Sequence, residues 1–80
     1  MGKWVVYILS CSDGSLYTGI TNDIEKRLQN HNLGRASKYT RSKRPVSVAY
    51  IEPAAGATAA RKREAAIKKL SRQSKLELIK

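Results

Sequence analysis

The sequence predicts an α+β domain in which helices pack on a three-stranded antiparallel sheet, in the order ββαβαα, over residues 1–80. Two short runs rich in β-branched and aromatic residues flank the turn signal Ser12-Asp13-Gly14, which is typical of a β-hairpin. An alanine-rich stretch that begins near Thr58 predicts a helix. Eighty residues are enough for one domain with a modest core, and no repeat or linker indicates a second domain.

The register of the hairpin decides whether Tyr7 and Tyr17 can share a site. A two-residue turn places Tyr7 opposite Ile20, and the two tyrosines then lie on opposite faces of the sheet. A three-residue loop that ends with Gly14 at positive φ places Tyr7 opposite Gly19, and both tyrosines then lie on one face. We expect the second register because it separates the apolar side chains better. The other face then forms the core side, with Trp4, Val6, Ile8, Leu16, Thr18 and Ile20.

A short helix is expected after the hairpin. Asn22 is the predicted N-cap, and Glu25 follows three residues later as in a capping box. Gly34 is the predicted stop. Arg27 and His31 are four residues apart and therefore lie on one stripe of the helix, at the border of its apolar face.

The second half of the chain is divided by proline and glycine. Residues 32–44 are expected to form a basic loop, and Pro45 precedes a third strand predicted over residues 46–51. A helix is predicted from about Thr58 to Leu70, with Thr58 as its N-cap. Ser71 is the expected cap of a last short helix.

The net positive charge lies entirely in this second half. Acids and bases balance over residues 1–34, so the whole formal excess of +10 lies in residues 35–80. Such an excess is larger than solubility requires and indicates a partner with a phosphate backbone. The residues expected to bind nucleic acid are Arg35, Lys38, Arg41, Lys43, Arg44, Arg61 and Lys68.

The remaining sequence features are uninformative about chemistry. A single cysteine, Cys11, cannot form an internal disulfide and suits a reducing cytoplasm, which is the expected location. The apolar run before Cys11 is too short for a signal peptide, and no segment is long enough to span a membrane. No membrane partner is expected, and the sequence leaves open a homodimer or a partner subunit.

Two strand motifs and two helices carry a resemblance to a known family. Val5-Val6-Tyr7 and Tyr17-Thr18-Gly19, followed by a helix with Arg27 and His31, resemble the two strand motifs and first helix of the GIY-YIG nuclease domain. The segment around Glu64 is similar to the family's second helix. The resemblance covers nearly the whole chain and is closest to small stand-alone bacterial members and to the nuclease subunit of structure-specific junction endonucleases. Valine replaces the first glycine of the motif, and Thr18 replaces the isoleucine.

The resemblance implies roles that the chemistry of these residues allows. Glu64 would hold a single Mg²⁺ or Mn²⁺ ion, since the chain has too few acids for a two-metal site, whereas one carboxylate with waters and phosphate can hold one Mg²⁺. Arg27 would neutralise the scissile phosphate. Tyr7 or Tyr17 would orient or deprotonate the attacking water, with positive neighbours lowering the tyrosine pKa. His31 would relay the proton or contact phosphate.

Two further implications concern position and function. Gly19 would line the site with its backbone, and either Tyr39 or Thr40 would fill a polar position that the family often has between the two helices. The predicted function is a metal-dependent endonuclease domain that hydrolyses phosphodiester bonds, with DNA as the expected substrate and repair or recombination as the expected setting. The alternative is a DNA- or RNA-binding protein that retains the fold without catalysis.

Overall fold

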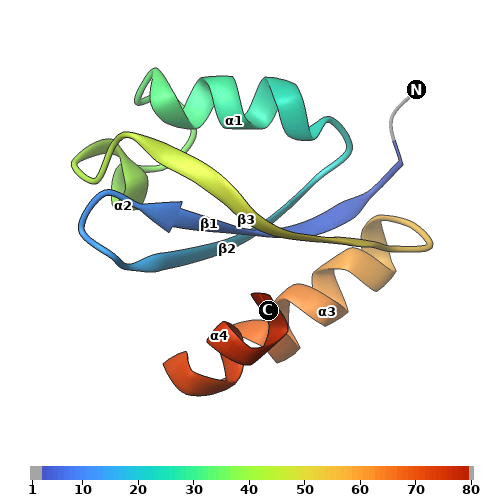
Figure 1. Ribbon diagram of the computed structural model, residues 1–80. Helices are drawn as coiled ribbons and strands as arrows, with labels where there is room; N and C mark the ends of the chain where they lie inside the picture. Colours follow the sequence, from blue (N-terminus) through green and yellow to red (C-terminus); the bar gives the residue numbers. More distant parts are fainter. Residues whose placement is uncertain (1–2, 80) are drawn as a thin grey trace.

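Three strands form one antiparallel sheet in the order β2-β1-β3, with β1 (Val5–Cys11) in the centre, β2 (Leu16–Thr21) on one side and β3 (Val46–Pro53) on the other. The computed structural model describes residues 3–79. Helix α1 (Ile24–Asn32) covers one face of the sheet, and α3 (Ala57–Lys68) and α4 (Arg72–Ile79) cover the other (Figure 1). The predicted α+β class is confirmed, with the sheet sandwiched between two helical layers.

The hairpin has the register that the sequence favours. Tyr7 lies opposite Gly19 and Leu9 opposite Tyr17, so both tyrosines face the same way. The amide of Gly14 donates to the carbonyl of Cys11 at 3.0 Å, and Gly14 has a φ of +86°. This left-handed conformation is accessible to glycine at little cost, which explains why the loop ends there.

The sheet has two buried faces rather than one. The predicted core side is confirmed: Val6 and Ile8 pack with Ala60 and Ile67 of α3. The tyrosine face is also buried, because β1 is the central strand and α1 covers its second side. Its cluster contains Tyr7, Leu9, Cys11 and Val46. The catalytic candidates therefore lie against a second apolar layer.

Two predicted helix caps are wrong. The N-cap of α1 is Asp23, whose side chain accepts from the amide of Lys26 at 3.2 Å, and not Asn22. The hydroxyl of Thr21 accepts from the amide of Asp23 at 3.1 Å and fixes Asp23 in an extended conformation just before the helix. Glu25 then stands one residue too early to complete a capping box.

Helix α3 begins earlier than the sequence predicts. Gly56, and not Thr58, is its N-cap, and the carbonyl of Gly56 accepts the first helical hydrogen bond from Ala60 at 2.9 Å. The helix ends at Lys68 instead of Leu70. The cap of the last helix is confirmed, since the hydroxyl of Ser71 accepts from the amide of Ser74 at 3.1 Å.

The basic segment 32–44 is not entirely a loop. Gly34 ends α1 with a φ of +78°, as predicted, but α2 (Lys38–Arg41) adds one helical turn. Its N-cap Ser37 accepts from the amide of Tyr39 at 3.1 Å, a local hydrogen bond that the basic composition conceals. Strand β3 extends two residues beyond the predicted end, to Pro53. Among the described residues, no helix is long and apolar enough to cross a membrane.

Candidate active site

A chain of hydrogen bonds joins the central strand to α1 and α2. The hydroxyl of Tyr7 lies 3.0 Å from Nε2 of His31, and Nδ1 of His31 lies 2.9 Å from Oγ1 of Thr40. These three side chains come from β1, α1 and α2 and are all buried. Burying polar groups is costly unless each finds a partner, and here each one does.

The contacts of Thr40 favour one arrangement of the protons in this chain. When the hydroxyl of Thr40 donates its single hydrogen to the carbonyl of Ser37, 3.3 Å away, Oγ1 accepts from Nδ1 of His31. His31 then carries its proton on Nδ1 when neutral, and the lone pair of Nε2 accepts from Tyr7. Tyr7 is thus held beside a base.

Gly19 allows Tyr7 to occupy its position. A Cβ added to Gly19 would lie 2.5 Å from the hydroxyl oxygen of Tyr7 and 2.6 Å from its Cζ, well inside van der Waals contact. The tyrosine ring can reach His31 only because the residue opposite it on β2 has no side chain. The predicted role of Gly19 as a position that lines the site with backbone agrees with this contact.

The electrostatic environment of Tyr7 differs from the prediction. Burial raises the pKa of Tyr7 above its ordinary value of 10.0, and the charge of Tyr17 acts in the same direction. Arg27 lowers the pKa and Glu64 raises it, but both effects are smaller than that of burial. Arg27 lowers this pKa as expected, but desolvation of the phenolate outweighs it, so the net shift in the protein alone is upward.

His31 is maintained in its neutral form. Burial, followed by the charge of Arg27, lowers the pKa of His31 below 6.5. A neutral imidazole with a free Nε2 lone pair can accept a proton at neutral pH. The pair therefore combines a protonated phenol with an unprotonated base.

Aromatic rings continue the site towards the surface. The ring of Tyr17 lies 6.4 Å from that of Tyr7 and 5.2 Å from that of His31, between centroids. Tyr39 lies 5.7 Å from Tyr17 and is 46% exposed. Of the two residues proposed for the polar position between the helices, Thr40 contacts His31, whereas Tyr39 extends the row of rings outwards.

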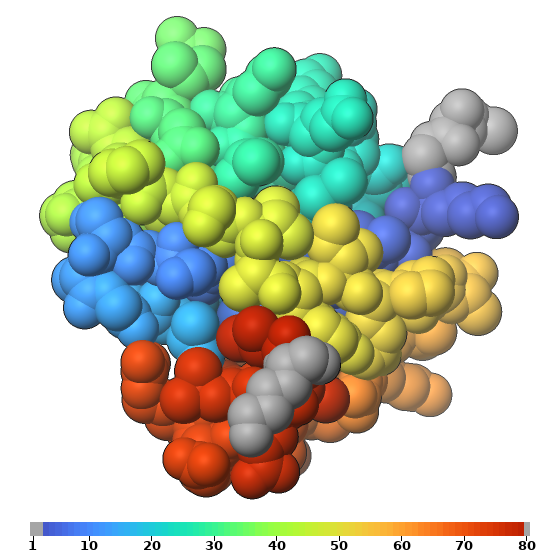
Figure 2. Space-filling model, viewed as in Figure 1, coloured from blue at the N-terminus to red at the C-terminus, as the bar shows by residue number. Residues whose placement is uncertain are grey.

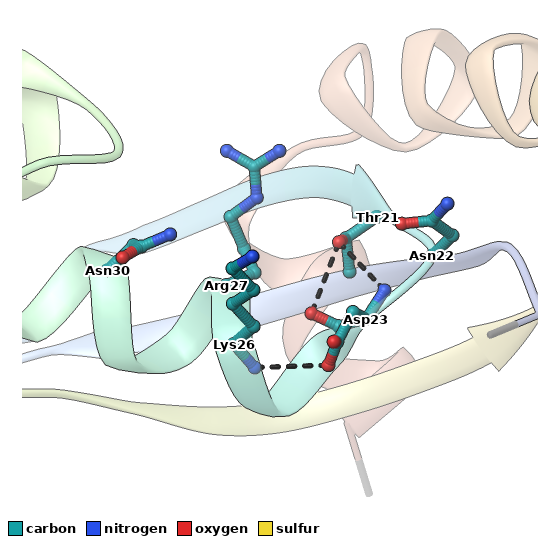
Figure 3. Close-up of a pocket in the computed structure, with 6 residues that line it drawn as sticks. All are labelled: Thr21, Asn22, Asp23, Lys26, Arg27 and Asn30. Atoms are coloured by element: carbon teal, nitrogen blue, oxygen red, sulfur yellow. Dashed lines mark hydrogen bonds between the residues drawn. The ribbon is translucent and has the colours of Figure 1, made fainter. Parts of the chain in front are cut away.

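Arg27 lies on α1 beside a polar cavity of about 220 Å³ (Figure 3). Its guanidinium makes no hydrogen bond with the other residues drawn there. Its charge acts on both Tyr7 and His31, so it lies within electrostatic range of their hydrogen bond. The lining residues are Thr21, Asn22, Asp23, Lys26, Arg27 and Asn30.

Glu64 is the residue predicted to hold the metal ion. It acts electrostatically on Tyr7, although it belongs to α3 on the other side of the sheet, because α3 packs along the edge strand β2. Glu64 also forms an ion pair with Lys68 at 3.4 Å, the ordinary helical pairing. Within residues 3–79, no group of three His, Cys, Asp or Glu side chains could hold an ion. The donor set fits only an ion that takes most of its ligands from water and substrate.

The predicted nucleic-acid-binding residues fall into two groups. Three have partners within the protein: Lys43 binds Asp13 at 3.0 Å, Arg44 donates to the carbonyl of Arg41 at 2.7 Å, and Lys68 binds Glu64. The others are exposed and have no ion pair among the described residues. These are Arg35, Lys38, Arg41 and Arg61.

Sequence reasoning missed two residues near the row of rings. Arg72 and Lys75 of α4 line a cavity together with Tyr39. Their spacing of three residues places them on one side of the helix, but only the packing of α4 beside the hairpin brings them to Tyr39. The sequence feature that could have pointed to Arg72 and Lys75 is the excess of positive charge in residues 35–80.

Comparison with known proteins decides the family. The model of the GIY-YIG catalytic domain matches residues 3–77, which is nearly the whole chain. The chain belongs to the GIY-YIG family. This membership confirms the resemblance that the sequence motifs indicate, and it makes the fold a nuclease fold whose general substrate class is nucleic acid.

Relatives from several bacteria cover nearly the same length. A UPF0213 protein of Syntrophus aciditrophicus is 56% identical over 100% of this chain and 93% of its own length. A UPF0213 protein of Staphylococcus saprophyticus is 52% identical over 99% of this chain and 96% of its own length. The solution NMR structure of a UPF0213 protein from Bacillus halodurans is similar with a TM-score of 0.61 and 38% identity, over 96% of this chain and 82% of that one. The solution NMR structure of a protein from E. faecalis is similar with a TM-score of 0.64 and 42% identity, over 94% of this chain and 80% of that one.

Proposed function

We propose that the protein is a metal-dependent endonuclease that hydrolyses phosphodiester bonds, with DNA as its substrate and repair or recombination as its setting. The observation that carries the proposal is the hydrogen bond from the buried Tyr7 hydroxyl to Nε2 of His31, with Arg27 and Glu64 within electrostatic range. Thr40 holds the other ring nitrogen of His31, which keeps the imidazole in position beside the Tyr7 hydroxyl.

Tyr7 and His31 act together as the base. A water molecule at the Tyr7 hydroxyl gives its proton to the phenol oxygen as its own oxygen attacks phosphorus, and Tyr7 passes its proton to Nε2 of His31. The bond between phosphorus and the leaving sugar oxygen breaks, and that oxygen takes a proton from solvent. No free phenolate forms, so the raised pKa of Tyr7 does not prevent the transfer. Tyr7 is only 2% exposed, so its hydroxyl is shielded from bulk solvent.

Arg27 stabilises the negative charge that develops on the phosphate. A guanidinium group presents a fork of N–H donors that matches two phosphate oxygens. Arg27 has no carboxylate partner among the described residues, and its charge is therefore available to the substrate. Tyr17, which is half-buried and in contact with both Tyr7 and His31, restricts the position of the water.

Glu64 would hold a divalent cation, Mg²⁺ or Mn²⁺. Such an ion supplies charge stabilisation to the leaving oxygen and the pentacovalent phosphate. The carboxylate must exchange its contact with Lys68 for the ion, which is inexpensive because the pair is partly exposed. Lys68 is then free to contact the nucleic-acid backbone.

A second function is favoured by one observation. Glu64 is paired with Lys68, and within residues 3–79 no other acid joins it in a cluster that could hold an ion. This arrangement is also what a DNA- or RNA-binding protein that kept the fold without catalysis would have. The two functions differ in one measurement, which is cleavage in the presence of a divalent cation.

The test is a cleavage assay with Mg²⁺ or Mn²⁺ on branched, nicked and single-stranded DNA, compared with RNA. Glu64→Gln should abolish cleavage but leave binding equal or tighter, since the amide does not hold the ion and one negative charge is lost. Glu77→Gln, which removes an exposed acid of α4, is the matched control and should cleave normally. Wild-type protein that binds but never cleaves would establish the binding function. Full cleavage by Glu64→Gln would refute the assignment of the ion to Glu64.

A further inference from the structure

A second polar cavity lies at the end of the row of rings, between the hairpin tip, α2 and the start of α4. Its volume is about 220 Å³, and its lining residues are Ser15, Leu16, Tyr39, Arg72 and Lys75. Figure 2 shows the hairpin tip between the segment around α2 and the beginning of α4 along one edge of the molecule. The cavity is distinct from the one that Arg27 lines.

The charge of this cavity is positive. Arg72 and Lys75 stand three residues apart and so share one side of α4. Neither forms an ion pair with the acids of residues 3–79. Both belong to the first turn of α4, where the helix dipole adds positive potential.

The acid of the hairpin tip, Asp13, does not neutralise them. Asp13 is two residues from Ser15, and both the amide and the hydroxyl of Ser15 donate to it, at 2.9 and 2.6 Å. Lys43 donates to its other oxygen at 3.0 Å. Hydrogen bonds from Ser15, followed by that from Lys43, hold the pKa of Asp13 below its usual range. The carboxylate is thus fully occupied. Glu77, two residues after Lys75 on α4, forms no ion pair with either cation.

The cavity is also connected to the Tyr7–His31 pair. Tyr39 forms one wall, and its ring lies 5.7 Å from that of Tyr17, which in turn lies 5.2 Å from His31. The ammonium of Lys43, which is paired with Asp13, lies 4.8 Å from the centre of the Tyr39 ring and helps to hold that ring in place. A nucleic-acid strand at the Tyr7 hydroxyl can therefore continue over Tyr17 and Tyr39 to α4.

The size of the cavity limits its occupant. Pockets for entire small molecules usually measure about 300–1,000 Å³, and this one measures about 220 Å³. It suits one anionic group of a ligand that lies mainly outside. A backbone phosphate fits this description, and each phosphate of a strand is paired best by Arg or Lys.

We infer that Arg72 and Lys75, beside the exposed Tyr39, form a subsite for a backbone phosphate of the nucleic-acid strand that flanks the phosphate being cleaved. The inference rests on the proposed function and extends it, because it makes α4 part of the substrate interface and gives the strand a path across the hairpin tip. It also explains why the last helix contributes cations on the side that meets Tyr39.

The experiment measures binding of a single strand and of a duplex as a function of salt for Arg72→Gln/Lys75→Gln. The matched control is Lys62→Gln/Lys69→Gln, which removes the same charge from exposed positions of α3 and its C-cap. Loss of one phosphate contact should reduce the slope of log K against log salt by about 0.7 on the single strand and about 0.9 on the duplex. The control should change the slope by clearly less. Thermal unfolding verifies that both variants fold.

The outcomes separate this inference from the proposed function. An unchanged slope in the Arg72/Lys75 variant, with tight binding by the wild type, overturns the subsite and leaves the nuclease proposal intact. Binding through the subsite without any cleavage supports the subsite and refutes the endonuclease. Amide NMR shifts at Arg72 and Lys75 that respond to inorganic phosphate but not to an oligonucleotide would indicate a free-phosphate site and overturn the strand path.

Discussion

The two faces of the sheet treat buried hydroxyl groups in opposite ways. On the α1 face, Tyr7 and Thr40 are both hydrogen-bonded to His31. On the α3 face, Thr18 is buried among apolar side chains, and its hydroxyl has no partner among the described residues. The difference teaches that the polar groups of the α1 face are held in defined positions, whereas the α3 face mainly supplies apolar burial and tolerates one unsatisfied group.

The largest expected effect separates the two faces by activity. Tyr7→Phe should lower the cleavage rate by about 10²–10⁴-fold, the usual contribution of a general base, while binding remains. Tyr50→Phe is the control, because Tyr50 belongs to the α3 face and donates to Glu52 at 2.7 Å. Single-turnover cleavage measures both. Equal losses in the two variants would contradict a special role for Tyr7.

The close contact across the hairpin gives the next effect. Gly19→Ala should destabilise the fold by about 1–3 kcal/mol, because the new Cβ forces the Tyr7 ring to move in a packed region. Gly56→Ala has no atom within 4 Å of its added Cβ and should cost less than about 1 kcal/mol. Urea unfolding compares the two. A larger loss of stability in Gly56→Ala than in Gly19→Ala would contradict the close contact between Gly19 and the Tyr7 ring.

The two buried threonines provide a matched pair. Thr40→Val should lower stability by about 1–3 kcal/mol, since Nδ1–H of His31 then loses its acceptor. Thr18→Val should raise stability by about 1 kcal/mol, because it replaces an unpartnered hydroxyl with a methyl group of the same shape. Chemical denaturation measures the free energy of unfolding of both variants, and its change from the wild type should have opposite signs in the two. Two losses of similar size would mean that Thr18 has a partner in solution.

The smallest effect is a dependence on pH. Because the pKa of His31 is lowered in the folded protein, the unfolded chain binds more protons than the folded one below 6.5. Stability should therefore be highest above this value and fall as the pH drops below it. The fall should be shallower in His31→Gln, measured by urea unfolding between about pH 4.5 and 8. A His31→Gln curve with the same slope as the wild type would place the titration at another group.

Much of the site could be predicted because its determinants are local. Gly14 fixes the register that brings Tyr7 and Tyr17 to one face, and the i, i+4 spacing of Arg27 and His31 needs no tertiary information. Thr40 could not be chosen over Tyr39, since only the turn of α2 directs one of them towards His31. The α+β class could also be predicted, because the turn signals and the periodicity that indicate it are local features of the sequence.

The errors concern choices that depend on neighbours. Asn22 and Asp23 are equally good caps by type, and the hydroxyl of Thr21 decides in favour of Asp23. The pKa of Tyr7 depends on how deeply it is buried, which no sequence pattern reveals. Arg72 was overlooked because its meaning comes from the packing of α4 beside the hairpin.

The position of β1 at the centre of the sheet has a consequence for synthesis. This strand leaves the ribosome first, yet it cannot gain its second neighbour until β3 has been made, about forty residues later. A nascent chain that ends before β3 exposes one edge of β1 together with the side chains of the face that α3 later covers. The sheet can therefore form only after most of the chain has been synthesised. The C-terminal half, including α3, should be needed to prevent aggregation of the nascent chain.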